Sequence, residues 1–333
     1  MKRLFYTLLF FLPCMLIACG GSDDTPDGDN NPPVVAPPSE EPVDSRLLYN
    51  GIRLPEQWPP VRSSSSELEK GMSPFYLSDK PSVINISVGR QLFVDNFLIE
   101  STNLKRTFYY PEYYSGNPIL TPEQDWEKTG TKGAAFAAPF SDGVWYDEKE
   151  GKYKMWYMAG GGSYATSGAG VTCYAESTDG IHWTKPTLSI VAGTNIVDYN
   201  SERDASVIWM DKQESNASKR YKMFLVARES GKWRYRYKTS PDGKVWRAAA
   251  QSEPIADRST VYKNPFRNVW VYSMRHNIRV DANKLVRARD YNENADPEAG
   301  TKKAEALLSA FWFGPWANEQ HHTDYPNIAP AIY

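Results

Sequence analysis

Cysteine is scarce in this chain of 333 residues, which contains only three. Cys14 and Cys19 lie near the start, so Cys173 stands alone in the remainder. A single thiol forms no disulfide within its own chain and builds no cysteine-rich metal site. Histidine is also rare, and we assign His321 and His322 to a solvated loop rather than to a cation site. The sequence therefore predicts no metal site and no cofactor.

Blocks of like charge are missing as well. The chain has 38 Lys and Arg against 40 Asp and Glu, and its formal net charge is −2. A nucleic-acid partner would require a basic patch, so we expect none. Aromatic residues are abundant by contrast, with 11 Trp, 21 Tyr and 13 Phe. Aromatic rings fill β cores and also stack on sugars, so the composition permits a carbohydrate partner.

A long apolar run occurs only at the N-terminus, where Lys2 and Arg3 precede an apolar stretch over residues 4–18. This pattern predicts a signal peptide over residues 1–18, because the stretch is too short to remain as a transmembrane helix. The sequence Leu-Ile-Ala-Cys that ends at Cys19 resembles a lipobox, which implies a lipid on Cys19 and a membrane anchor. The alternative is an ordinary secretory signal with an incidental cysteine.

Residues 19–50 contain little that is apolar, and we expect them to form a disordered tether. Its first part, GGSDD at residues 20–24, resembles the surface-export signal of Bacteroidetes-type lipoproteins. We therefore expect an outer-membrane or cell-surface lipoprotein, with the periplasmic face as the alternative. Residues 51–90 are predicted to be an N-terminal extension, and residues 91–333 the folded domain.

An internal repeat runs through the predicted folded domain. The run YKMWY at residues 153–157 matches YKMFL at residues 221–225, and each is followed by a segment S-x-D-G-x-x-W, at residues 177–183 and 240–246. Asp-Gly supplies the positive φ that a tight turn needs. The pattern predicts a turn that closes a β-hairpin, with the Trp folding back over it, rather than a catalytic aspartate.

A further strand precedes each repeated run, and these two strands contain Val144 and Val207. A third, which contains Val261, precedes the run VWVY at residues 269–272. Val144 and Val207 are 63 residues apart, and Val207 and Val261 are 54 residues apart. Each step suits one propeller blade of about 40–50 residues plus loops. Helical periodicity is confined to residues 302–310. The predicted fold class is all-β, a β-propeller.

Three segments resemble the motifs of the five-bladed β-propeller glycosidases, the group of glycoside hydrolase families 32, 43 and 68, with family 130 more distant. RDASVIW at residues 203–209 resembles the Arg-Asp-Pro motif of family 32, which is the nearest in register. DRSTVY at residues 257–262 lies in the register of the family's acid motif, and SDGVWY at residues 141–146 in that of its nucleophile motif. Asp142 lies two residues past the nucleophile position, which Phe140 holds.

The resemblance implies a site of three carboxylates. It assigns Asp142 as base or nucleophile, Asp204 as the carboxylate that stabilises an oxocarbenium-like transition state, and Asp257 as the acid. The alternative is that each aspartate only caps a turn. The neighbouring residues predicted to orient carboxylates or bind substrate are Arg203, Arg258, Trp145 and Trp209.

Only three blade openings are recognisable, so we expect an incomplete five-bladed propeller with about three to four blades. The function implied is hydrolysis of glycosidic bonds in an extracellular poly- or oligosaccharide. One alternative is a non-catalytic glycan-binding surface lipoprotein with a degenerate site. Another is a structural propeller for protein partners.

Overall fold

Strands make up most of the regular structure in the described part of the chain. The computed structural model describes residues 46–59, 80–87, 93, 96, 98–107, 109–129, 135–160, 170–199, 202–281, 284–304 and 310–313. They belong to one unit, Ser45–Tyr333, and Met1–Asp44 forms another. The predicted signal peptide, Cys19, His321 and His322 lie outside the described residues. Within these ranges, no helix is both long and apolar enough to cross a bilayer.

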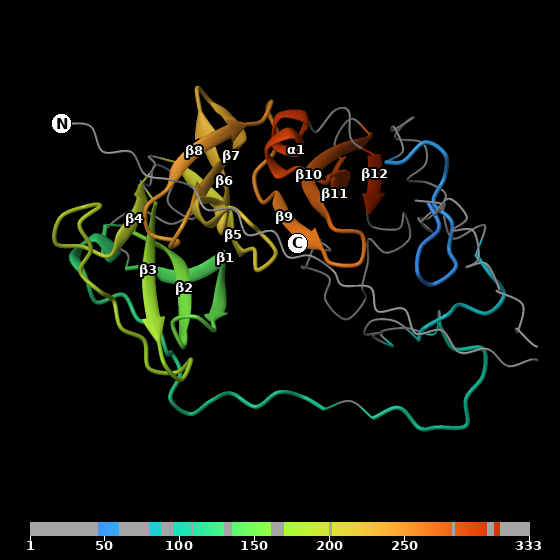
Figure 1. The fold of residues 1–333 in the computed structure, drawn as a ribbon, viewed down its shortest axis with the longest axis horizontal. Coiled ribbons are helices and arrows are strands. Elements are labelled where there is room, and N and C mark those ends of the chain that lie inside the picture. The colour runs from blue at the N-terminus through green and yellow to red at the C-terminus, as the bar shows by residue number, and fades with distance from the viewer. Residues whose placement is uncertain are drawn as a thin grey trace, which may run out of the picture. The chain divides into compact units, whose positions relative to one another are not determined.

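Twelve described strands form three four-stranded antiparallel sheets, which Figure 1 shows in green, yellow and orange. The first sheet contains β1 (Ala137–Asp147), β2 (Lys152–Ala159), β3 (Val171–Ser177) and β4 (Ile196–Tyr199). The second contains β5 (Arg203–Met210), β6 (Tyr221–Glu229), β7 (Lys232–Ser240) and β8 (Arg247–Gln251). The third contains β9 (Thr260–Asn264), β10 (Val269–Asp281), β11 (Lys284–Asn294) and β12 (Ala310–Phe313).

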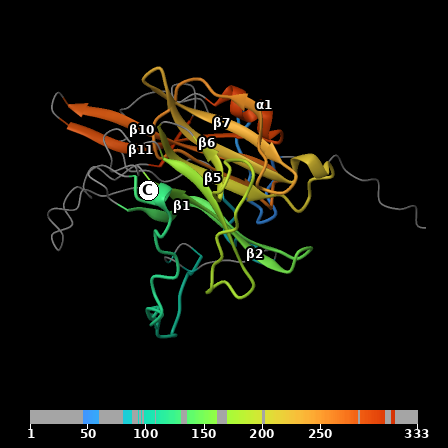
Figure 2. The same ribbon diagram turned by 90° about the vertical axis from the view of Figure 1, so that its left-hand side faces the viewer.

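The order of the strands confirms the predicted all-β fold of propeller blades. Each sheet keeps the order of the sequence, and its first strand lies beside the first strand of the next sheet, β1 against β5 and β5 against β9. None of the three sheets formed by the described strands closes on itself, so the architecture is that of an incomplete propeller. The long hairpin of β10 and β11 runs out past the neighbouring strands (Figure 2).

Apolar side chains point to both faces of the second strands β2 and β6, which explains why neighbouring sheets stack on them. In β2, Met155 and Tyr157 face a cluster on one side while Trp156 faces the cluster shared with the second sheet. In β6, Met223 faces that shared cluster and Phe224 faces the third sheet. Successive side chains of a strand point to opposite faces. A strand that is apolar on both faces is therefore buried between two layers.

The repeated turns have the predicted conformation. Gly180 has a φ of 77°, and the Ser177 hydroxyl accepts the backbone N–H of Gly180 at 2.9 Å. Trp183 folds back, and its indole N–H donates to the Gly180 carbonyl at 3.1 Å. In the second turn, the equivalent Gly243 also has a φ of 77°, and its carbonyl accepts the Trp156 indole N–H at 2.6 Å. The second turn thus joins two sheets.

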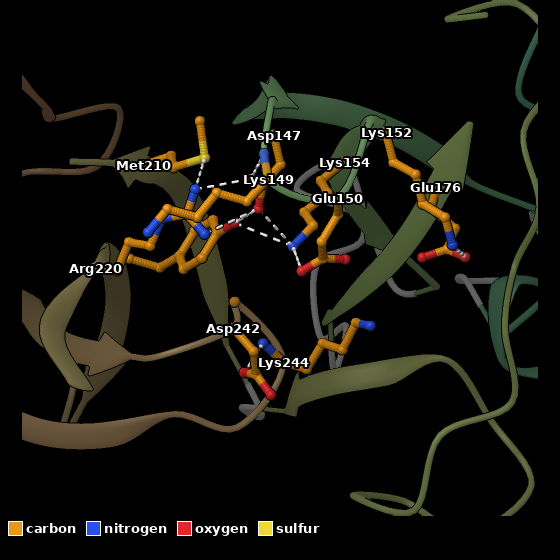
Figure 3. Close-up of polar contacts among 12 residues, drawn as sticks. Asp147, Lys149, Glu150, Lys152, Lys154, Glu176, Met210, Arg220, Asp242 and Lys244 are labelled. Atoms are coloured by element: carbon orange, nitrogen blue, oxygen red, sulfur yellow. Dashed lines mark hydrogen bonds and ion pairs between the residues drawn. The ribbon is translucent and has the colours of Figure 1, made fainter. Parts of the chain in front are cut away.

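A buried ion-pair network connects the first two sheets (Figure 3). Asp147 at the end of β1 pairs with Lys154 of β2 at 3.0 Å, and both side chains are fully buried. Arg220, which precedes β6, donates to Asp147 at 2.7 Å, and the Tyr221 hydroxyl does so at 2.7 Å. Burial alone would raise the pKa of Asp147, but the hydrogen bonds from Arg220, Tyr221 and Lys154 outweigh it and hold the pKa well below its usual range.

The second sheet repeats this arrangement one blade further on. Asp211, which follows β5, pairs with Lys222 of β6 at 3.1 Å. A cation from the next sheet, Lys263 of β9, completes the group at 3.1 Å from Asp211. In both places an aspartate after a first strand therefore binds one cation of its own sheet and one from the sheet that follows.

The segment before β1 packs against the outer face of the first sheet. Residues 125–127 form a short 3-10 helix, η3 (Asp125–Glu127), and the fully buried Glu127 accepts the Tyr157 hydroxyl at 2.6 Å and the Lys185 ammonium at 2.9 Å. A second such turn is η5 (Ala217–Lys219). The α-helix α1 (Pro297–Lys303) lies earlier than the sequence periodicity predicts, because Asp296 caps its start and Pro297 takes its first position.

Candidate functional site

The N-terminal ends of the first strands bring together the segments that carry the predicted acids. Asp142 lies in β1, Asp204 is the second residue of β5, and Asp257 lies in the loop before β9. The Ser141 hydroxyl donates to the Ser206 carbonyl at 3.0 Å, which joins β1 to β5 at this end. Three segments that are far apart in the sequence therefore meet here.

Asp204 is held by the residue that follows Asp257. The backbone N–H of Arg258 donates to Asp204 Oδ2 at 2.5 Å, and Arg258 Nε lies 3.0 Å from Asp204 Oδ1. Arg258 has a φ of 58°, which is uncommon for a residue other than glycine and is found most often where a site constrains the backbone. This double contact fixes the carboxylate of Asp204 beside the loop that carries Asp257.

Phe140 connects the first sheet to this pair. The guanidinium carbon of Arg258 lies 4.6 Å from the centre of the Phe140 ring, in cation–π contact. Both first strands have a break in register here, before Gly143 in β1 and before Ser206 in β5, so the pairing does not assign Phe140 an equivalent in β5. That Phe140 holds the position of a family nucleophile stays a prediction.

Asp142 is fully buried and forms an ion pair. Its Oδ1 accepts a hydrogen bond from Arg203 Nη2 at 2.7 Å, and Arg203 Nη1 also donates to the Thr172 hydroxyl at 2.6 Å. Burial raises the pKa of Asp142, although the charge of Arg203 opposes this. The positive φ values of Ser141 and Gly143 and the break in register before Gly143 turn this part of β1 toward Arg203. Asp142 therefore lies inside the junction of two sheets.

Asp257 is the most exposed of the three carboxylates. Its side chain is 28% exposed, against 4% for Asp204 and none for Asp142. Arg275 of β10 holds Asp257 Oδ1 at 2.7 Å. The exposed part of Asp257 excludes Oδ1, which is buried where it faces Arg275.

Trp145 and Trp209 pack within the protein. Their rings are 4.9 Å apart in an edge-to-face contact, and the Trp145 indole N–H donates to the Ile208 carbonyl at 2.7 Å. These contacts give both rings a packing role between the sheets. Their predicted role in substrate binding stays a prediction.

Arg275 and Arg289 belong to this region but were not predicted from the sequence. Arg289 Nη1 donates to the carbonyl of Arg258 at 2.6 Å and so supports the loop that holds Asp204. The sequence does mark Arg275 as a residue that needs a partner, because it is a charged residue that follows the apolar run of β10. That Asp257 is the partner depends on contacts between distant segments.

A pocket of about 260 Å³ lies at the other end of the first strands, lined by residues of the turns after β1 and β5. Of its charged residues, Asp211, Glu214 and Arg220 pair with buried residues. Lys212 and Glu148 are 2.5 Å apart, and Arg220 holds Asp147. The pocket is separate from the predicted acids.

No protein-family model matches the chain. No curated protein matches it either. Among solved structures, it is similar to a sucrose-bound variant of the family 32 β-fructofuranosidase of Bombyx mori, with 12% identity, a TM-score of 0.34, and coverage of 52% of this chain and 36% of that one. A sucrose-6-phosphate hydrolase from Lactobacillus gasseri is 13% identical over 60% of this chain and 38% of that one, with a TM-score of 0.37.

A glycosyl hydrolase from Bacteroides ovatus is 13% identical over 58% of this chain and 59% of that one, with a TM-score of 0.31. The chain thus spans 36–59% of the length of these three proteins. Identities and TM-scores this low assign no activity, so any activity has to be argued from the site itself. These three structures are glycoside hydrolases, the class that the motifs of this chain resemble.

Proposed function

We propose that the protein hydrolyses glycosidic bonds of an extracellular glycan, with Asp204 and Asp257 as its working carboxylates. The observation that supports this proposal is the contact of Arg258 with Asp204, because Arg258 directly follows Asp257 in the loop before β9. Glycoside cleavage needs one carboxyl group that protonates the leaving oxygen and a second that stabilises or attacks the sugar. Asp257, the more exposed, takes the first role and the fixed Asp204 the second.

Asp142 has a supporting role in this proposal. It neutralises the buried Arg203, whose Nε also lies 3.3 Å from the carbonyl oxygen of Asp204. Loss of Asp142 would leave a buried guanidinium without its counter-charge, which is costly. Asp142 therefore keeps the start of β5 in place while Asp204 and Asp257 face the sugar.

Release of reducing sugar from a panel of plant, microbial and host polysaccharides tests the proposal. We expect Asp204→Ala and Asp257→Ala to lower the rate by at least about 100-fold, the usual range for loss of an acid or base. Asp179→Ala is the matched control, because Asp179 lies in an exposed turn. No release by the unaltered protein, or equal release by all four proteins, would contradict the proposal.

A glycan-binding protein without catalysis is the second candidate, and the first sheet favours it. Phe140, rather than an acid, contacts Arg258, and the nearby Asp142 is inaccessible in its pair with Arg203. Retention on a polysaccharide affinity gel, unchanged when all three aspartates are replaced by alanine and with no product released, would select this function over hydrolysis.

We also propose that the protein is exported and anchored to the outer membrane or cell surface through Cys19. The support is the apolar stretch over residues 4–18 and the Leu-Ile-Ala-Cys sequence that ends it. Incorporation of labelled palmitate in cells, lost in Cys19→Ala, is the expected result. Equal labelling of both proteins would exclude a lipid on this cysteine.

A further inference from the structure

Two arginines lie directly opposite each other on the paired strands β10 and β11. Arg275 and Arg289 are register partners. Side chains in such a pair project from the same face with Cβ atoms about 4.5–5.5 Å apart, and like charges there repel each other. Burial is the main cause of a lowered pKa of Arg289, and the charge of Arg275 adds to it. Such a pair requires negative charge beside it.

The described residues supply one carboxylate for these two arginines. Arg275 pairs with Asp257, whereas Arg289 donates only to backbone oxygens, one of them that of Arg258. Asp290 follows Arg289, but adjacent residues of a strand point to opposite faces. Among the described side chains, no carboxylate pairs with Arg289. One buried guanidinium charge is therefore left over beside Asp257.

The group is open to solvent on the side of the acids. The side chains of Asp257, Arg258 and Arg275 are 28%, 24% and 15% exposed. The Nε of Arg275 is buried and has no hydrogen-bond partner in the described structure. An anion that reaches Asp257 from solvent therefore also meets the guanidinium of Arg275, the ion-pair partner of Asp257.

We propose that Arg258, Arg275 and Arg289 bind the carboxylate of an acidic sugar, a uronic acid residue, next to Asp257. The planar fork of a guanidinium matches the two oxygens of a carboxylate. A carboxylate on the sugar also supplies the negative charge that the facing arginines lack. This inference rests on the proposed glycan-cleaving function and narrows its substrate class from glycans in general to acidic ones.

The assignment can be tested on the unaltered protein by comparing an acidic oligosaccharide with the same compound after its carboxyl groups have been reduced. Oligogalacturonides and glucuronic-acid-substituted xylo-oligosaccharides are titrated into the protein by calorimetry, beside the same compounds with their carboxyl groups reduced to alcohols. We expect the acidic form to bind about 10-fold to 100-fold more tightly, the range of hydrogen bonds to a charged group. Added salt should narrow the difference. Equal affinity of the two forms, tighter binding of sulfated sugars, or no binding of either form would overturn the proposal.

Variants then locate the binding group. Arg289→Gln should abolish the preference for the acidic form, and Arg289→Lys should restore part of it, whereas Arg236→Gln on β7 should leave it unchanged. If Arg289→Gln does not fold, Arg275→Gln provides the same comparison. Preference retained in a folded Arg289→Gln or Arg275→Gln would refute the assignment. Equal cleavage of acidic and neutral glycans would refute the acidic-sugar site and leave the proposed hydrolysis intact. Binding that is selective for acidic glycans, without any cleavage, would refute the hydrolysis and leave the acidic-sugar site intact.

Discussion

Asp147→Asn removes the central charge of the network that joins the first two sheets. Asp147 and Lys154 are fully buried, and Arg220 and Tyr221 also donate to Asp147. Breaking a buried ion pair by removing one partner costs about 3–5 kcal/mol. Lys154 keeps a second partner, Glu150, at 2.7 Å, so we expect a loss near the lower end, about 3 kcal/mol in the free energy of unfolding.

The dependence on pH follows from the lowered pKa of Asp147 in the folded protein. An unfolded aspartate titrates near about pH 3.9, so the stabilisation is complete above that pH and is lost as the pH falls through the lower, folded pKa. The difference between the unaltered protein and Asp147→Asn should therefore be constant from about pH 5 to pH 8 and shrink below about pH 4.

Urea denaturation at several pH values provides the assay, with Glu148→Gln as the matched control. Glu148 pairs with Lys212 at 2.5 Å, but the two side chains are 69% and 52% exposed. An exposed ion pair contributes about 0–1 kcal/mol. If Asp147→Asn costs no more than Glu148→Gln, or if its cost is the same at pH 3 as at pH 7, the reasoning about this network is refuted.

The remaining predictions concern the packing between sheets. A Cβ at Gly243 would lie 2.3 Å from Trp156 Cζ2, whereas at Gly231, with nearly the same φ, it would meet nothing. Gly231→Ala should lower the free energy of unfolding by about 1–2 kcal/mol, because alanine disfavours this positive φ. Gly243→Ala should lower it by about 1–3 kcal/mol more, because the added methyl group overpacks against Trp156. Equal melting temperatures of the two variants would contradict this. Lys222→Met should cost about 3 kcal/mol, because it leaves the buried Asp211 with one partner fewer, and an unchanged urea midpoint would show that the pair contributes nothing.

Features that depend on a few neighbouring residues could be predicted from the sequence. The turn at residues 177–183 is an example, because Ser177, Asp179 and Gly180 make their hydrogen bonds within the turn. The run at residues 153–157 was predicted as a strand for a similar reason, since an apolar strand of β-type residues is recognisable without knowledge of its neighbours. The all-β fold and the order of the sheets follow from such local units.

Features set by bulges and long-range register could not be predicted. The alignment of Val144 with Val207 is offset by one residue, since Val144 pairs with Met155 of β2 but Val207 pairs with Phe224 of β6. The register equivalent of Val144 is Ile208, which pairs with Met223, and the residue types alone do not indicate this. The facing positions of Arg275 and Arg289 depend in the same way on the register of a long hairpin.

Hydrolysis and simple binding differ here in what the first sheet contributes to the site. In the arrangement that the motifs resemble, each of three sheets offers a carboxylate to one sugar. In this protein the first sheet offers the ring of Phe140, which stacks on Arg258, while Asp142 is used to neutralise Arg203 inside the junction. The proposed hydrolysis therefore requires the acids of the second and third sheets. Because one loop orients both of them, any change that moves Arg258 would disturb Asp204 and Asp257 together.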